Sequence, residues 1–141
     1  MKVKVKKLKG EAKIPSFAHE GDAGMDIYST EDKVITPKNR ETIELGFAMQ
    51  FPSDYMVIFK DRSSLASEYG VHTLAGVIDS GYRGEYKAVL VNLGDESFEV
   101  ETGQKVGQML FLPRPEIEVE QVEELSDSIR GEGGFGSTGK F

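Results

Sequence analysis

The sequence predicts an all-β protein with one short helix, folded as a sandwich, a jelly roll or a barrel. Apolar side chains alternate with polar ones along most of the chain, which is the period of a strand with one buried face. Turn-forming Gly, Pro, Asp and Asn residues interrupt these runs about every 8–12 residues, as they do in sandwiches and barrels. The length of 141 residues suits one domain with a core of its own.

The expected strands follow from this alternation in chain order. Val3 and Val5 alternate with lysines, which indicates an edge strand, because lysines discourage pairing with another chain. A turn signal at residues 101–104 separates two of the later strands. The other short apolar or alternating runs are residues 34–35, 43–47, 55–59, 86–93, 98–100, 106–112 and 117–119.

One segment departs from the strand pattern and predicts the helix. Residues 63–69 begin with serine, which is favoured at helix starts. Gly70 follows them, and glycine suits the left-handed position just after a helix. The sequence therefore predicts one helix of about two turns between two strands.

The composition excludes several classes of function. The 24 acidic and 17 basic residues give a net charge of −7, which argues against nucleic acid as the main partner. The chain has no cysteine, which excludes disulfides, thiolate zinc sites and cysteine catalysis, and its two histidines leave little for a His-rich metal site or a Ser-His-Asp triad. No apolar run approaches the roughly 20 residues of a membrane span, and the lysine-rich start lacks the apolar core of a secretory signal. We therefore expect a cytoplasmic protein that binds neither membranes nor nucleic acids.

The C-terminal tail is rich in glycine and is expected to be flexible unless something binds it. Residues 134–140 match a phosphate-binding GxxxxGK loop, but Phe141 stands where Ser or Thr belongs and no strand ends just before the loop. A Walker-type NTPase is therefore rejected. Backbone amides, hydroxyls and Arg130 would still suit a polyphosphate. Phe135 adds a stacking ring, which the alternative, a merely solubilising tail, does not need.

Further candidates for chemistry lie inside the chain. Arg62, followed by two serines at a helix start, is a candidate anion site, although a simple helix cap beside a surface arginine is the commoner outcome. Asp79 lies in a glycine-flanked segment and is a candidate general base, with a turn aspartate as the alternative. Asp26 follows a glycine and has the same two interpretations. Gln108 stands in an apolar strand and needs a hydrogen-bond partner if it is buried.

Together and in this order, these segments resemble the five motifs of the trimeric dUTP pyrophosphatase (dUTPase) family. The matching segments are residues 23–27, 62–66, 76–79 with 82–84, Gly103 with Gln108, and 130–139. They span nearly the whole chain, and the last motif is long and specific. The resemblance implies a β-rich dUTPase domain over residues 1–129 and a flexible C-terminal lid over residues 130–141.

The resemblance also implies an assembly and an activity. The fold would be a jelly-roll-like β domain that forms a homotrimer, each active site would draw on three subunits, and the tail would close as an ordered lid. The reaction would be the hydrolysis of dUTP, a small-molecule substrate, to dUMP and pyrophosphate with magnesium (Mg²⁺). Such an enzyme removes dUTP from the nucleotide pool and supplies dUMP for dTMP synthesis.

Each matched residue takes a role from the resemblance. Asp79 matches the carboxylate that activates the water attacking the α-phosphorus, and Asp26 matches the one that holds magnesium through its waters. Tyr82 matches the ring that packs under the deoxyribose and excludes a 2′-hydroxyl. The other substrate contacts are Arg62, Ser63, Ser64 and Gln108 for the phosphates, Ala75, Gly76, Val77 and Ile78 for uracil, Phe135 as the aromatic lid, and Arg130, Ser137 and Thr138 for the γ-phosphate, with Gly136 beside them.

The sequence departs from the family pattern at three positions. Asp61 replaces a small residue or proline and could weaken phosphate binding or orient the arginine that follows; Asp22 replaces a small polar residue, and Gly81 a second aspartate. The pair Ser80-Gly81 resembles the dCTP deaminases, which share the fold, so a deaminase or a bifunctional deaminase–pyrophosphatase is the alternative enzyme. That family has a glutamate ten residues after the matched aspartate, where this chain has Val89. A non-catalytic dUTP-binding relative is a further alternative, against which Asp79 argues.

Overall fold

The all-β prediction is confirmed by a computed structural model, which describes residues 1–135 and 137. Every pairing among the strands it describes is antiparallel. The helix α1 (Ser63–Tyr69) lies between β6 and β7 in the chain. The strands are β1 (Lys4–Lys7), β2 (Met25–Tyr28), β3 (Lys33–Ile35), β4 (Arg40–Glu44), β5 (Phe47–Gln50), β6 (Tyr55–Lys60), β7 (Val71–Leu74), β8 (Val77–Ile78), β9 (Lys87–Asn92), β10 (Phe98–Val100) and β11 (Lys105–Pro113).

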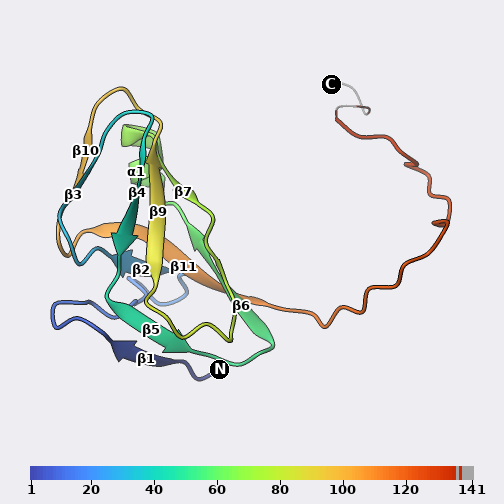
Figure 1. Cartoon of the computed structure of the whole chain (residues 1–141), viewed down its shortest axis with the longest axis horizontal. Helices are drawn as coiled ribbons and strands as arrows, with labels where there is room; N and C mark the ends of the chain where they lie inside the picture. Colours follow the sequence, from blue (N-terminus) through green and yellow to red (C-terminus); the bar gives the residue numbers. More distant parts are fainter. Residues whose placement is uncertain (136, 138–141) are drawn as a thin grey trace.

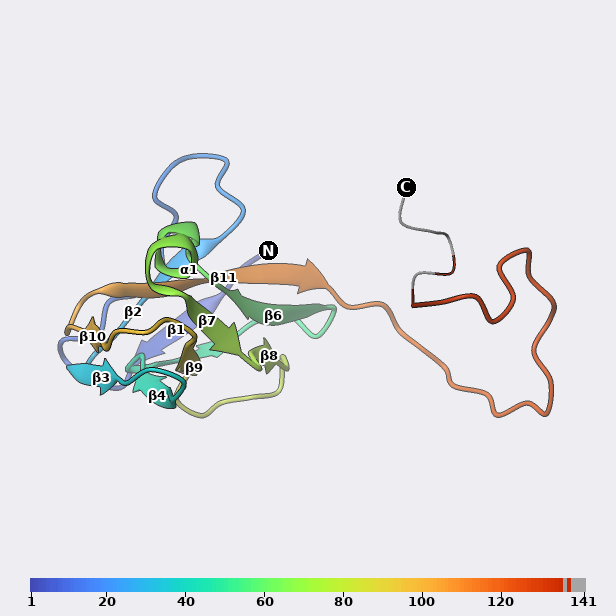
Figure 2. The same ribbon diagram turned by 90° about the horizontal axis from the view of Figure 1, so that it is seen from above.

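The strands group into sheets that enclose one apolar core. One sheet has the order β2-β11-β6-β8 and another the order β4-β9-β7, while β1 pairs with β5 and β10 with β3. Figure 1 shows β4, β9 and β7 side by side, and Figure 2 shows β11 and β6 on the opposite side of the body from β3 and β4. Burial of apolar side chains between these layers is the main stabilising contribution. The largest of them are Tyr86, Phe47, Ile27, Ile35, Ile43, Leu45, Leu90 and Met109.

Strand β11 does most to position the candidate site, because it pairs with β2 on one side and with β6 on the other. Its register against β2 shifts between Lys105 and Gly107, so that Lys105 lies opposite Tyr28 and Gln108 lies opposite Asp26. Such a bulge adds one residue to one strand. Because neighbouring residues of a strand point to opposite faces, the extra residue brings Lys105 and Gln108 to the same face as Asp26.

Most of the expected strands are confirmed, and two expectations are wrong. The single run expected over residues 43–47 is divided, because Gly46 adopts a left-handed φ of 70° and turns the chain between β4 and β5. The alternation at residues 117–119 forms no strand. Ile117 and Val119 are 74% and 89% exposed, since no strand of this chain lies beside them in the part that the structure describes.

The helix is confirmed, with one difference at its first turn. Gly70 has a left-handed φ of 68°, and its N–H donates to the carbonyl of Ala66 over 3.1 Å, as a residue that ends a helix does. The N-cap is Arg62 instead of a serine, and it makes no side-chain capping bond. Within the described residues, no helix is long and apolar enough to cross a membrane.

The C-terminal arm, defined here as residues 114–135, leaves the body after β11 and has neither helix nor strand (Figure 1). Its first residue, Arg114, is still attached, because its backbone N–H and its Nε donate to the carbonyls of Asp54 and Ser53. Beyond Arg114, the hydrogen bonds of the described arm join only residues near the C-terminus to one another. The arm carries exposed apolar side chains, namely Ile117, Val119, Val122, Leu125, Ile129 and Phe135.

Candidate active site

Asp26 lies at the centre of a first group of predicted site residues. Strand β2 places it opposite Gln108, and its side chain is only 15% exposed. Lys105 Nζ lies 2.5 Å from one carboxylate oxygen of Asp26, and Arg62 Nε lies 3.8 Å from the other. A partly buried carboxylate needs such cations, because its charge is poorly solvated. The structure therefore joins two predicted residues, Asp26 and Arg62, and adds Lys105, which the sequence did not indicate.

Gln108 is held in a fixed orientation by its neighbours. Its Nε2 donates a hydrogen bond of 2.8 Å to the backbone carbonyl of Asp61. A Cβ at Gly24 would lie 2.3 Å from Gln108 Oε1, so only glycine leaves space for this amide. The expected hydrogen-bond partner of Gln108 is therefore present. Since an amide nitrogen carries two hydrogens, one N–H remains to donate to a ligand.

The two hydroxyls of the anion motif lie on the first turn of α1. Ser63 is exposed and Ser64 is half-buried, and neither caps the helix. Both serines thus occupy the two positions that follow Arg62, on the first turn of the helix.

Asp61, the first departure from the family pattern, is engaged by strand β7. Its Oδ2 lies 2.7 Å from His72 Nδ1, and its Oδ1 accepts a hydrogen bond of 2.6 Å from the backbone N–H of Thr73. Burial tends to raise the pKa of the Asp61 carboxyl, but the hydrogen bonds from His72 and Thr73 outweigh burial and hold this pKa below its usual range. The carboxylate is therefore bonded to β7.

The other two departures lie at exposed positions. Asp22 accepts a hydrogen bond of 2.8 Å from the backbone N–H of His19 and so closes its own loop. Gly81 has open space around it, since a Cβ there would meet nothing within 4 Å. Neither Asp22 nor Gly81 therefore contacts another predicted site residue through these features.

A second group of predicted residues lines a cavity of about 300 Å³. The turn between β7 and β8 forms one wall, with left-handed φ angles of 57° at Ala75 and 103° at Gly76. Gly76 packs directly on the core, because a Cβ there would lie 3.0 Å from Phe59 Cβ, and its carbonyl accepts the N–H of Phe59. The turn thus presents its backbone to the cavity. The lining includes Leu74, Ala75, Gly76, Val77, Ile78, Asp79, Tyr82, Glu85, Tyr86, Lys87 and Val89.

Asp79 and Tyr82 belong to the same turn after β8. The backbone N–H of Tyr82 donates to the carbonyl of Asp79 over 3.1 Å. The hydroxyl of Tyr82 donates to the carbonyl of Glu85, and a Cβ at Gly84 would lie 2.4 Å from that hydroxyl, so Gly84 makes room for the ring. The side chain of Asp79 is exposed, while the ring of Tyr82 is 46% exposed beside the cavity. An accessible carboxylate and a fixed ring therefore share one wall.

Tyr86 is a cavity-lining residue that the sequence analysis missed. It is fully buried among Phe47, Phe59 and Tyr82, with ring centroids 5.2–6.3 Å away. Its hydroxyl has no hydrogen-bond partner among the described residues, and burial raises its pKa to about 12. A tyrosine at the start of an apolar run was the available signal, because a phenol there brings a polar group into the core.

The predicted tail residues lie apart from both groups. Arg130 Nε donates to the carbonyl of Gly133 over 2.7 Å, and the ring of Phe135 is fully exposed. The N–H of Ser137 donates to the carbonyl of Gly134. Gly136 and Thr138 lie outside the described residues.

One chain therefore brings the predicted residues together only in part. Asp26, Arg62 and Gln108 form one group, and the turn with Asp79 and Tyr82 forms another. Within the described residues, no hydrogen bond or ion pair joins the two groups, and the arm contacts neither.

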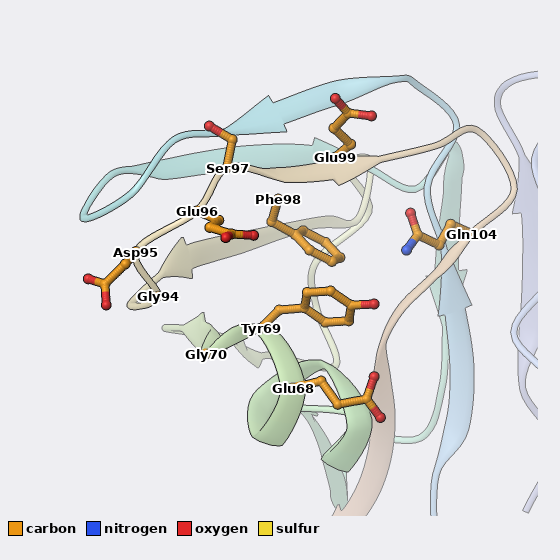
Figure 3. A pocket seen from close by; sticks show the side chains of 10 residues that line it. All are labelled: Glu68, Tyr69, Gly70, Gly94, Asp95, Glu96, Ser97, Phe98, Glu99 and Gln104. Carbon is orange, nitrogen blue, oxygen red and sulfur yellow. The ribbon is translucent and has the colours of Figure 1, made fainter.

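A larger hollow, of about 540 Å³, lies at another place on the surface (Figure 3). The rings of Tyr69 and Phe98 meet inside it with centroids 5.1 Å apart, and none of the predicted site residues lines it. Its rim bears carboxylates, which would repel a triphosphate, so we place the candidate active site at the smaller cavity. These carboxylates are Glu68, Asp95, Glu96 and Glu99.

The comparisons with known proteins agree with the motifs. The model of the dUTPase family matches residues 10–139. The deoxyuridine 5′-triphosphate nucleotidohydrolase of Clostridium tetani is 46% identical over 98% of this chain and 97% of its own, and that of Clostridioides difficile is 49% identical over 97% of each. The solved structure of the Staphylococcus bacteriophage 80alpha dUTPase with dUPNHPP has a TM-score of 0.92 at 30% identity and covers 99% of both chains.

A mutant dUTPase from phage phi11 of S. aureus is also similar in structure, with a TM-score of 0.82 at 25% identity, over 88% of this chain and 98% of that one. That structure was described for its coordination of a structural Mg(II) ion. With a family model over most of its length and relatives close to half identical, this chain belongs to the dUTPase family.

Proposed function

We propose that this chain is a dUTP diphosphatase, which hydrolyses dUTP to dUMP and pyrophosphate and thereby clears dUTP and supplies dUMP. The observation that carries the proposal is the identity of 46–49% with two deoxyuridine 5′-triphosphate nucleotidohydrolases over nearly the full length. The two groups of site residues supply what the reaction needs, namely nucleoside selection, phosphate binding and a base.

Nucleoside selection belongs to the cavity beside β8. Uracil is read by the backbone of Ala75, Gly76, Val77 and Ile78, which the left-handed turn presents to the cavity. The deoxyribose packs on the ring of Tyr82, whose position is fixed by the bond to Glu85. A 2′-hydroxyl would then meet a rigid ring, so UTP is rejected by volume.

Phosphate binding belongs to the group around Asp26. Arg62 supplies a guanidinium, Gln108 its remaining N–H, and Ser63 and Ser64 their hydroxyls. Such donors stabilise the charge of the phosphates, which matters here because the chain as a whole is acidic.

Asp26 suits a position beside magnesium. Its oxygens are ligands of the kind that Mg²⁺ prefers, and Lys105 and Arg62 hold the carboxylate in place. Within the described residues, no three metal-binding side chains cluster, which fits an ion held mainly by waters and substrate phosphates. When bound, magnesium would neutralise part of the phosphate charge.

Asp79 is the general base of this proposal. Its exposed carboxylate accepts a proton from water, whose oxygen forms a bond to the α-phosphorus. The bond between that phosphorus and the α,β-bridging oxygen breaks, and pyrophosphate leaves with the bonding pair. Val89 lines the same cavity at the position of the deaminase glutamate, and this supports hydrolysis over deamination.

The complete site is assembled by a homotrimer. The Asp26 group, the Asp79 turn and the arm each hold part of the site, and within the described residues of one chain no hydrogen bond or ion pair joins them. The exposed apolar side chains of the arm favour packing on another subunit, because so many exposed apolar groups are unusual for a chain that remains alone. We therefore divide the chain into a β-rich dUTPase domain, residues 1–129, and a lid, residues 130–141, which brings Arg130, Phe135, Gly136, Ser137 and Thr138 to a neighbour's nucleotide.

Product analysis tests the activity. The chain is incubated with dUTP, dCTP, dTTP or UTP, with and without magnesium, and the products are separated by ion-exchange chromatography. We expect dUMP and pyrophosphate from dUTP with magnesium and little turnover of the others. Release of ammonia from dCTP would instead indicate the deaminase, and tight dUTP binding without product would indicate a non-catalytic relative.

Light scattering tests the assembly. We expect one trimeric species in solution. Full activity of a monomer at nanomolar dilution would contradict a site shared between subunits.

A further inference from the structure

Asp61 departs from the family pattern next to the phosphate-binding residues, and its contacts suggest a use for this departure. We infer that Asp61 is a positioning residue, which fixes Arg62 and Gln108 relative to the strand that leads to the nucleoside turn. The inference rests on the proposed function, because it concerns how the same site holds dUTP.

We call the hydrogen bonds of Asp61 to His72, Thr73 and Gln108 the clasp, and its first part joins the end of β6 to β7. Both carboxylate oxygens of Asp61 are used, one by His72 Nδ1 at 2.7 Å and one by the backbone N–H of Thr73 at 2.6 Å. Bonds to a charged acceptor are stronger than neutral ones, and this side chain is only 23% exposed. Since Thr73 lies two residues before Ala75, the clasp anchors the strand that continues into the nucleoside turn.

The second part of the clasp uses the backbone of Asp61. Its carbonyl accepts the hydrogen bond from Gln108 Nε2, and this bond leaves the other N–H of the amide for a phosphate oxygen. The next residue, Arg62, is extended at the start of α1 and reaches Asp26. A movement of Asp61 would therefore displace Arg62 through the chain and Gln108 through the hydrogen bond.

The same contacts argue that Asp61 does not oppose phosphate binding at short range. Its carboxylate is bonded to β7, and within the described residues it forms no ion pair with Arg62. The guanidinium of Arg62 thus retains its charge for the ligand and for Asp26.

The test compares two carboxylates that make similar bonds. Asp61→Ala removes the clasp, while Asp32→Ala removes the bonds that Asp32 Oδ1 accepts from the N–H of Thr102 at 2.6 Å and from its hydroxyl at 2.9 Å, away from the site. Calorimetry measures the affinity of the full-length protein with magnesium for a non-hydrolysable dUTP analogue and, by displacement, for deoxyuridine, which has no phosphate.

We expect Asp61→Ala to weaken the analogue about tenfold, the loss typical of a bond to a charged group, and deoxyuridine less than twofold. Deoxyuridine is spared because Phe59 still binds the carbonyl of Gly76 and β8 still pairs with β6. The KM for dUTP should rise with the loss in affinity. Asp32→Ala should leave the ratio of the two affinities unchanged.

A milder variant keeps the test decisive if the alanine variant does not fold. Asp61→Asn retains one acceptor for the N–H of Thr73 but loses the charge, and we expect it to weaken the analogue about threefold. An unchanged analogue affinity, or an equal loss for the analogue and deoxyuridine, would overturn the positioning role. A wild-type protein that does not hydrolyse dUTP would instead overturn the proposed function, which the affinity ratio does not measure.

Discussion

The body and the C-terminal arm prepare their parts of the proposed site in different ways. In the body, Asp26, Arg62 and Gln108 are held by ion pairs and by a hydrogen bond to the backbone of Asp61. In the arm, the side chain of Phe135 is fully exposed and contacts no part of the body. One part of the site is therefore formed before the nucleotide binds, and the other part is not.

This difference suggests that the body positions the substrate and that the arm closes over it, as two separate steps of the proposed function. Ordering a chain segment costs about 1–2 kcal/mol per residue, so the arm gains a fixed position only when a ligand or another subunit offsets that cost. In the proposed function, a nucleotide that fills the cavity and presents a γ-phosphate would supply contacts for the lid, whereas a poor ligand would not. Under this proposal the preformed groups of the body would read the nucleoside, and the arm would make turnover depend on the whole triphosphate.

The largest effect is expected from removing the proposed general base, Asp79, in the body. Asp79→Asn should lower kcat by at least about 10²–10⁴-fold, the range typical of general bases, because the amide cannot accept the proton from water. Binding of a non-hydrolysable dUTP analogue should persist, since the cavity and the phosphate donors are unchanged. Stopped-flow turnover and calorimetry measure the two quantities. A near-normal kcat would show that another group activates the water.

Removing the lid should have the next largest effect. Deletion of residues 130–141 should lower kcat at least about tenfold, because Arg130 and Phe135 no longer enclose the nucleotide. Thermal unfolding and light scattering should remain close to wild type, since the described residues of the deleted segment include none of the buried core. Hydrolysis at the full-length rate would show that the lid is only a solubilising end.

A third variant tests how the body alone selects dUTP over UTP. Tyr82→Ala removes the ring beside the cavity and should raise kcat/KM for UTP relative to dUTP by about tenfold, since the 2′-hydroxyl then has space. Tyr82→Phe is the matched control, because it keeps the ring and loses only the bond to Glu85. If the ratio stays the same in the alanine variant, sugar selection lies elsewhere.

The smallest effect concerns the stability of the folded body. Tyr86→Phe should raise the free energy of unfolding by about 1 kcal/mol, because it removes a buried hydroxyl that has no partner among the described residues. Urea denaturation measures this change. A loss of stability would show that the hydroxyl is hydrogen-bonded in solution or in the assembled protein.

Local patterns were enough to predict most of the fold. Alternation marked the edge strand β1, short apolar runs marked β6 and β11, and glycine at position 70 marked the end of the helix. The alternation at residues 117–119 was misleading, because a strand needs a partner and this chain supplies none beside that segment in its described part. The short strands β2 and β7 were missed, since four residues carry little periodicity.

The site was predictable in its residue types but not in its contacts. The motif analysis named Asp26, Arg62 and Gln108, whose proximity depends on the pairing of β2 and β11. The partners of Asp61 could not be inferred, because His72 is 11 residues away in the chain and is brought near by the turn after α1. The backbone carbonyl that binds Gln108 leaves no mark in the sequence at all.

The bulge in β11 makes the site sensitive to chain length as well as to residue identity. Lys105 and Gln108 share a face because one residue is added between them relative to β2, an odd spacing that a regular strand would place on opposite faces. Deletion of Val106 would restore a regular strand and separate the two side chains without changing either residue. Evolutionary insertions and deletions should therefore be rarer in this segment than in the loop before β2, and conservative substitutions at Lys105 should be better tolerated than any change in the number of residues.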